Sequence, residues 1–330
     1  MEYCTVGKIV KGVGGLYYVR LSSDADTGPL AGALVPCRAR GVLRHKHLTP
    51  TVGDNIKLIY SDDSYRQENG RFCPKEDGRD VMISEILPRK NLLIRPPVAN
   101  LDTVFVSVAA ASPSPVTETV DKLLSILEFN NIEPVIVVGK CELDREKASE
   151  LREIYELAMY RVFVLSCRED EGVNEIRKYV KNELGGKTAA FAGASGVGKS
   201  TLMNAIFPAL CLETSDISRK IERGRHTTRH VELFPLPGAA DSYLADTPGF
   251  SMLDFERFDF FSKDDLPYTM REFAPYLGKC RYKDCTHTKE EDCAVLRAVR
   301  EGKIAKSRHD SFIAMYQVLK EKKAWESKNP

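Results

Sequence analysis

The pattern of apolar and polar positions changes near residue 90. Before it, short runs rich in β-branched and aromatic residues alternate with turn residues, which predicts strands. The runs cover residues 7–10, 16–21, 33–36, 55–60 and 81–87. Five short strands over this length predict a small β-barrel of the OB type. The polar stretch from 60 to 79 predicts a long loop, and the prolines within 86–97 predict a domain boundary.

From residue 100 onward, strand-like apolar runs alternate with segments of helical periodicity. The expected strands lie at 102–109, 134–138 and 162–166, and the expected helices at 118–129, 145–158 and 173–184. Further along we expect a helix at 201–207, a strand at 231–235 and a strand that ends in the sequence ADTPGF at 245–250. Such alternation predicts a parallel sheet covered by helices on both faces.

Composition and charge fit a globular protein of two or three domains. The chain has 330 residues, 43% of them hydrophobic and 29% charged, with a formal net charge of +1. We find no apolar run long enough to span a membrane and no signal peptide, so we expect a cytoplasmic protein without a membrane partner. The basic segment 37–48 fits either a loop that binds a phosphate backbone or a solvated surface loop.

Residues 188–202, TAAFAGASGVGKSTL, form the most specific motif of the chain, the phosphate-binding loop G-x-x-x-x-G-K-[ST] between a strand and a helix. Glycines let the backbone approach a polyphosphate, and the helix N-terminus attracts its charge. Lys199 is expected to reach the β- and γ-phosphates, and Ser200 to bind Mg²⁺. The expected nucleotide-binding residues of this loop are Gly193, Ala194, Ser195, Gly196, Val197, Gly198, Lys199, Ser200 and Thr201.

A second motif, D-T-P-G, follows the phosphate loop at the end of a predicted strand. Its Asp246 would hold Mg²⁺, and the backbone N–H of Gly249 would sense the γ-phosphate. A second segment should recognise the base of the nucleotide, and we call it the base-reading segment. The candidate is VVGKCELD at 137–144, with Gly139, Lys140 and Glu142.

Ser166 and Cys167, after the next predicted strand, are candidates for the second base-contacting loop. Both base-reading segments precede the phosphate loop instead of following it. The order of motifs therefore predicts a circularly permuted GTPase domain.

Near the C-terminus, cysteines and a histidine have metal-ligand spacing, C-x₄-C-x-H-x₅-C. The ligands would be Cys280, Cys285, His287 and Cys293. Three thiolates and one imidazole leave no open position, which predicts structural Zn²⁺. The basic and aromatic residues among them, such as Arg281 and Tyr282, fit an RNA-backbone contact, whereas the helices expected after residue 294 mainly pack against the metal site.

Together these motifs resemble the circularly permuted, small-ribosomal-subunit-dependent GTPases of the RsgA family, also called YjeQ or EngC. The resemblance runs from the barrel through GRHTT at 224–228 and DTPGF at 246–250 to the cysteine-rich segment. It implies an OB-fold RNA-binding domain at 1–90, a permuted α/β P-loop GTPase domain at 91–262 and a zinc-binding α-rich domain at 263–330. It further implies GTP and GDP, Mg²⁺ and Zn²⁺ as ligands, and hydrolysis stimulated by the small ribosomal subunit and its rRNA during late maturation of that subunit. Nothing in the sequence suggests a dimer.

The resemblance assigns the remaining roles and shows two departures. Thr227 or Thr228 would close the first switch on Mg²⁺, and His226 would position the attacking water or contact RNA. Gly139 replaces the usual Asn or Thr, and Glu142 replaces Asp, so we expect weaker preference for guanine over adenine. Two alternatives are a nucleotide-dependent rRNA-binding module with incidental hydrolysis and an ATP-using P-loop enzyme.

Overall fold

The computed structural model describes residues 2–23, 28–41, 43, 48–68, 71–75, 81–207, 231–236, 241–246 and 261–321. The chain divides into two compact units, and each is described by itself. The first unit comprises Met1–Asp102, Gly185–Ala190 and Glu213–Gly249, and the second comprises Thr103–Leu184, Phe191–Leu212 and Phe250–Pro330. The three-domain division at residues 90 and 262 stays a prediction.

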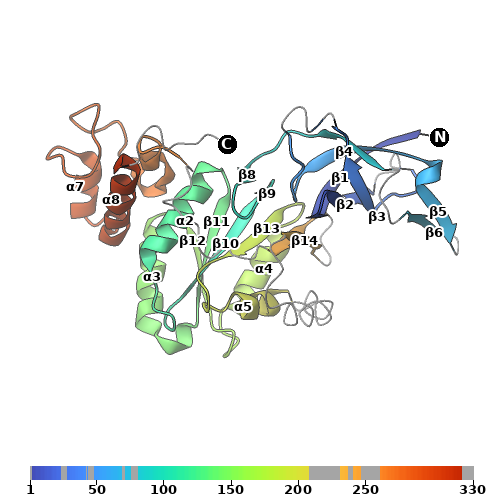
Figure 1. The fold of residues 1–330 in the computed structure, drawn as a ribbon. Coiled ribbons are helices and arrows are strands. Elements are labelled where there is room, and N and C mark those ends of the chain that lie inside the picture. Colours follow the sequence, from blue (N-terminus) through green and yellow to red (C-terminus); the bar gives the residue numbers. More distant parts are fainter. Residues whose placement is uncertain are drawn as a thin grey trace. The chain divides into compact units, whose positions relative to one another are not determined.

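The first unit contains the five-stranded barrel that the sequence predicts. Its strands are β1 (Glu2–Val13), β2 (Leu16–Leu21), β3 (Leu34–Ala39), β4 (Asn55–Ser61) and β7 (Met82–Ile86). They run in the order β1-β2-β3-β7-β4, and a pairing of β1 with β4 closes the barrel (Figure 1). β1 can pair with both neighbours because it is long and carries a register shift between Ile9 and Lys11. Ile9, Val19 and Ile56 are fully buried inside.

The prediction of a long loop after residue 60 is partly wrong. This segment contains a 3-10 turn, η2 (Asp62–Ser64), and a hairpin of β5 (Tyr65–Glu68) and β6 (Arg71–Pro74). The Asp62 carboxylate accepts hydrogen bonds from the hydroxyls of Tyr3, at 3.1 Å, and Tyr65, at 2.8 Å. Contacts with a distant tyrosine thus order a segment whose polar composition indicates a loop. The boundary segment also holds a small hairpin, β8 (Leu92–Leu93) with β9 (Val98–Ala99).

The second unit holds the α/β layers that position the glycine-rich loop. Parallel strands β12 (Arg161–Val164), β11 (Glu133–Gly139) and β10 (Thr103–Ala109) are followed in the sheet by β13 (Thr188–Ala192). The helices are α2 (Thr117–Phe129), α3 (Arg145–Leu157), α4 (Val173–Glu183) and α5 (Lys199–Ile206). Right-handed crossovers place α2 and α3 on one face and α4 on the other, because the chain reverses direction across the sheet after β12 (Figure 1).

Two later strands belong to the first unit. β15 (Tyr243–Asp246) pairs parallel with β13, as the predicted α/β pattern requires. β14 (Glu232–Pro235) instead runs antiparallel to β15 and to β1, where Lys11 forms a 2.8 Å ion pair with Glu232. β14 thus adds an antiparallel strand next to the predicted parallel ones. A short connection returns the chain from β14 to β15, and such a connection permits only antiparallel pairing.

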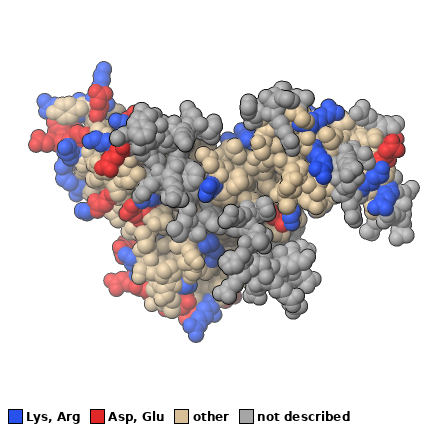
Figure 2. All heavy atoms as spheres, viewed as in Figure 1, with Lys and Arg blue, Asp and Glu red and all other residues tan. Residues whose placement is uncertain are grey.

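The C-terminal part of the second unit consists of 3-10 turns η4 (Leu266–Thr269) and η5 (Arg271–Phe273) and of helices α7 (Ala294–Arg300) and α8 (Lys306–Glu321). α8 packs against α2 and buries Arg308 completely. Figure 2 shows basic and acidic residues intermixed over these helices, which agrees with the near-zero net charge. No helix within the described ranges is long and apolar enough to cross a membrane.

Candidate nucleotide and metal sites

The glycine-rich loop joins β13 to α5, the strand-loop-helix context that the sequence predicts. Gly193 has a φ of 141°, and a Cβ at this position would lie 2.2 Å from the Ser107 carbonyl oxygen, so only glycine fits. Gly196 and Gly198 also have positive φ. The helix begins directly after Gly198, and its first N–H groups have no partners within the helix. The loop thus has the backbone geometry that a polyphosphate requires.

Lys199 lies over this loop. Its ammonium group donates hydrogen bonds of 2.8 Å to the carbonyl oxygens of Gly193 and Ala194, and burial lowers its pKa. Phosphate oxygens are stronger acceptors than carbonyl oxygens for a charged donor. The lysine is therefore placed to exchange its carbonyl contacts for contacts with a β- or γ-phosphate.

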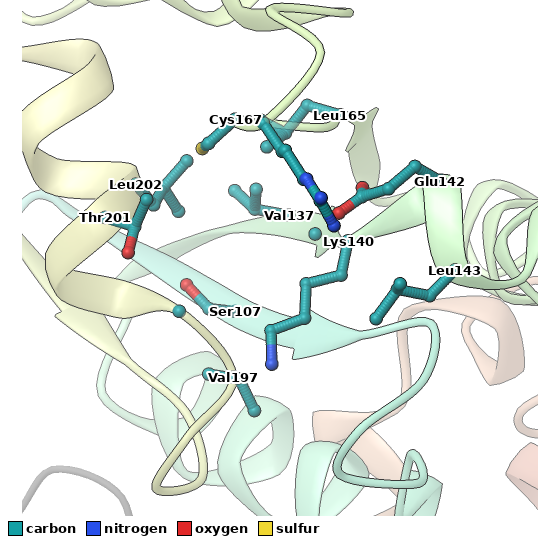
Figure 3. Close-up of a pocket in the computed structure, with 13 residues that line it drawn as sticks. Ser107, Val137, Lys140, Glu142, Leu143, Leu165, Cys167, Val197, Thr201 and Leu202 are labelled. Atoms are coloured by element: carbon teal, nitrogen blue, oxygen red, sulfur yellow. The ribbon is translucent and has the colours of Figure 1, made fainter.

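A cavity of about 260 Å³ opens beside the loop (Figure 3). Its walls come from β10, β11, the segments that follow β11 and β12, and the start of α5. The lining residues are Ser107, Val137, Gly139, Lys140, Glu142, Leu143, Leu165, Cys167, Arg168, Val197, Gly198, Thr201 and Leu202. Open α/β sheets bind ligands in such a crevice at the carboxyl ends of the strands.

Lys140 connects the base-reading segment to the phosphate loop. It has a left-handed backbone conformation with a φ of 57°. Its ammonium group donates a 2.8 Å hydrogen bond to the Gly196 carbonyl oxygen and another to the carbonyl oxygen of Ser112. Because one side chain spans both segments, the position of the base-reading loop depends on that of the phosphate loop.

Two oxygens of the cavity residues are buried without a hydrogen-bond partner within the described part of the chain, Glu142 Oε2 and Ser107 Oγ. Figure 3 shows the carboxylate of Glu142 turned toward the cavity. A buried polar atom without a partner costs free energy that a ligand donor can offset. Glu142 is thus a candidate acceptor for the N–H groups of a guanine base.

Gly139 leaves space in this cavity. A Cβ built there has Val197 O as its nearest neighbour, at 3.8 Å, and the φ of Gly139 is not positive. The backbone therefore does not require glycine. Without a side chain, this position supplies no polar group for a base.

Seven of the fourteen predicted nucleotide-binding residues line the cavity, and six others belong to the adjoining phosphate loop. Cys167 lines the cavity, whereas Ser166 is buried and its hydroxyl accepts a hydrogen bond from the Glu169 N–H at 3.1 Å. Ser107 and Arg168 are lining residues that sequence reasoning missed. A serine inside the otherwise apolar run of β10 was the available signal for the first of them.

Several predicted residues lie outside the described ranges. These are His226, Thr227 and Thr228 of the first switch and Gly249 of the second. Asp246 is the last residue of β15, so the strand runs into the D-T-P-G motif as the sequence predicts.

The predicted metal ligands converge in the second unit. The ligand atoms of Cys280, Cys285, His287 and Cys293 all lie within 4.8 Å of one another. Tetrahedral Zn²⁺ with ordinary bond lengths requires S···S edges of about 3.8 Å and S···N edges of about 3.5 Å. Cys280 Sγ lies 3.8 Å from Cys293 Sγ and 3.5 Å from His287 Nδ1. The edges among Cys280, His287 and Cys293 therefore match those of a tetrahedral zinc site, and the four side chains could hold such an ion.

Glu290 organises the loop between the last two ligands. Its carboxylate accepts hydrogen bonds from the backbone N–H groups of Thr286 at 2.9 Å, Thr288 at 3.1 Å and Lys289 at 3.1 Å. Burial opposes ionisation of Glu290, but the hydroxyl and N–H of Thr286 and the backbone N–H groups of Glu290 and Lys289 outweigh it and lower its pKa to about 2. The ionised carboxylate thus holds three backbone N–H groups of the ligand loop.

Comparison with known proteins decides the family. A family model described as RsgA GTPase matches residues 86–256, and one described as RsgA N-terminal domain matches residues 6–65. A protein named small ribosomal subunit biogenesis GTPase RsgA, from Alkaliphilus metalliredigens, is 38% identical over 97% of this chain and 99% of its own length. The chain belongs to the RsgA GTPase family. Members of this family are named GTPases, that is, enzymes that hydrolyse GTP, and the motif order and fold of this chain agree with that chemistry.

Solved structures support the RsgA fold over the whole chain. The crystal structure of YjeQ from Thermotoga maritima matches with a TM-score of 0.72 and 29% identity, covering 97% of this chain and 100% of that one. The crystal structure of YloQ, described as a circularly permuted GTPase, matches with a TM-score of 0.71 and 31% identity over 97% and 96% of the two chains. The predicted RsgA fold class, with barrel, permuted GTPase domain and Cys/His cluster, is confirmed.

Proposed function

We propose that this chain hydrolyses GTP to GDP and phosphate under stimulation by the small ribosomal subunit, and that it acts in the late maturation of that subunit. The observation that carries the proposal is the single cavity in which the base-reading residues meet the phosphate loop, joined by the Lys140–Gly196 bond. The full-length relatives named as small ribosomal subunit biogenesis GTPases supply the partner. The protein would work as a cytoplasmic monomer that contacts rRNA.

Within this proposal the phosphate loop binds the polyphosphate. The backbone N–H groups of 193–201 and the Lys199 ammonium group would bind the phosphates, while Ser200, Asp246 and Thr227 or Thr228 would hold Mg²⁺. Magnesium would neutralise charge on the β- and γ-phosphates. Gly249 would report the presence of the γ-phosphate to the second switch.

The base would enter the cavity beside Lys140 and bring its N–H donors to Glu142. A glutamate reaches further than aspartate and loses more rotamer freedom when it is held in place. We therefore expect GTP and GDP to bind better than ATP, with a smaller ratio than an Asp-bearing relative shows. Competition of unlabelled GTP, GDP and ATP against labelled GDP measures this ratio. Equal competition by ATP and GTP would favour the ATP-using alternative.

His226 would position the attacking water, because the residue after the switch glycine is Phe250, which cannot hydrogen-bond to water. An imidazole suits this role near neutral pH. Hydrolysis by His226→Ala, measured in the presence of small ribosomal subunits, tests the assignment. Full stimulated activity in the variant would limit His226 to RNA or solvent contact.

The cysteine and histidine cluster would hold one structural Zn²⁺. Its four side chains leave no open position for substrate or water, so the ion would stabilise the fold and take no part in hydrolysis. The barrel and the metal region would both bind rRNA.

A further inference from the structure

A second cavity, of about 380 Å³, lies in the first unit and shares no residue with the nucleotide cavity. It is bounded by β1 and β2 of the barrel, by the segment after β7, and by residues next to β13 and β15. The side chains of Lys8, Arg20 and Lys90 line it together with those of Asp102, Asp241 and Tyr243.

Lys8 and Arg20 form a like-charge pair on neighbouring strands. They are directly opposite residues in the antiparallel pairing of β1 with β2, so their side chains leave the sheet on the same face. An anion that contacts both side chains would be attracted by two positive charges at once.

Both cations have hydrogen-bond donors to spare. The Lys8 ammonium group donates to the Thr188 hydroxyl at 3.3 Å and lies 5.4 Å from the centre of the Tyr243 ring. It forms no ion pair with a carboxylate of the described residues. Burial lowers its pKa, and the negative charges of Asp102 and Asp241 oppose that shift. Arg20 donates to the Gly32 carbonyl oxygen at 3.0 Å and retains further N–H groups of its guanidinium.

The acidic groups of the cavity do not cancel this charge. Asp102 already accepts from Lys90 at 2.7 Å and from the Thr188 N–H at 2.9 Å. Asp241 is exposed at the surface. Three cations, Lys8, Arg20 and Lys90, therefore share the cavity with two carboxylates, which leaves one positive charge in excess.

We propose that this cavity binds a phosphate group between Lys8 and Arg20. The arginine fork can engage two phosphate oxygens and the lysine a third, while Tyr243 and the neighbouring apolar residues contact the group that carries the phosphate. The phosphate belongs either to an RNA backbone or to a small phosphate-bearing molecule. No residue of the nucleotide cavity takes part in this binding.

The test uses the full chain saturated with GDP and Mg²⁺, so that the phosphate loop is already occupied. Inorganic phosphate is titrated at constant ionic strength against chloride, and the thermal midpoint is recorded for the wild type, Lys8→Gln and Arg20→Gln. Lys57→Gln is the matched control, because Lys57 is an exposed barrel lysine paired with Glu85. We expect the midpoint of the wild type and the control to rise by about 2 °C or more, and both cavity variants to lose that rise.

Binding of a short single-stranded RNA over a range of salt concentrations identifies the source of the phosphate. If an RNA phosphate occupies the cavity, the slope of log affinity against log salt falls by about 0.7 in Lys8→Gln. If the slope is unchanged while inorganic phosphate still separates the variants from the wild type, the phosphate belongs to a small molecule. The proposal is overturned if neither probe distinguishes the cavity variants from the wild type and Lys57→Gln.

Discussion

The Lys140 ammonium group donates a 2.8 Å hydrogen bond to the Gly196 carbonyl oxygen, and this bond fixes the base-reading segment against the phosphate loop. The two residues lie 56 positions apart in a chain where the base-reading segment comes first. The two segments therefore meet in space although the base-reading segment comes before the phosphate loop in the chain.

Lys140→Met should weaken GDP binding by about tenfold or more, since hydrogen bonds from charged donors contribute roughly 1.5–3 kcal/mol. The methionine retains the apolar stem and removes only the donors. Calorimetric titration with GDP measures the loss. Lys147→Met is the control, because Lys147 is on α3 and pairs with Glu150 at the surface. Equal affinities of the two variants would show that the bond to Gly196 is dispensable.

The double variant Gly139→Asn, Glu142→Asp should increase the ratio of GTP to ATP affinity by about tenfold, the free energy of one good hydrogen bond. Space for the amide exists beside Val197, and the shorter carboxylate loses less rotamer freedom. Competition binding with both nucleotides measures the ratio. A ratio at or below that of the wild type would contradict the expectation that Gly139 and Glu142 weaken the preference for guanine.

The sequence was sufficient to predict features that depend on neighbouring residues. The glycines of 193–198 and the ligand set of 280–293 are recognisable from the spacing of residues close together in the chain. The five barrel strands are predicted by the alternation of short apolar runs with turn residues. Features made by distant segments were missed. Arg308 has the sequence context of a surface helix residue, yet its guanidinium contacts Asp121, 187 positions away.

The Arg308 cluster shows why burial is hard to predict. Arg308 donates to Asp121 at 2.7 Å and to Glu272 at 2.7 Å, with all three side chains almost completely buried. A charged side chain is buried only where oppositely charged or polar groups of other elements pair with it. Helical periodicity of α8 carries no information about those partners.

Arg308→Met should destabilise the fold by about 3–5 kcal/mol, because it leaves two buried carboxyl groups without their cation. Urea unfolding measures this loss against Lys306→Met, whose lysine forms an exposed pair with Asp310 on the same helix. Similar stability of the two variants would mean that the buried pairs contribute no more than surface pairs.

The destabilisation by Arg308→Met should be smaller at pH 5 than at pH 8. Burial raises the pKa of Asp121, and the positive charge of Arg308 opposes that rise. Without Arg308 the folded variant keeps a proton that the unfolded chain releases near pH 4, so its stability falls as the pH rises toward the raised pKa. Unfolding of variant and wild type at matched pH values checks the sign. A difference that does not change with pH would contradict it.

Native mass spectrometry should find one zinc ion per chain, and Glu290→Gln should release it to a chelator several times faster than the wild type. The amide is a weaker acceptor for the N–H groups of Thr286, Thr288 and Lys289. Glu291→Gln, an exposed neighbour, should behave as the wild type. Identical release from both variants would remove Glu290 from the support of the site.

The rate of GTP hydrolysis with and without small ribosomal subunits tests the central claim most directly. We expect slow turnover by the chain alone and an increase of about tenfold or more when the subunits are added. A partner that orders the first switch would position the attacking water, which Phe250 cannot do because it cannot hydrogen-bond to water. Large ribosomal subunits should leave the rate unchanged. Equal rates with and without small subunits would contradict the account and leave a nucleotide-dependent RNA-binding module whose hydrolysis is incidental.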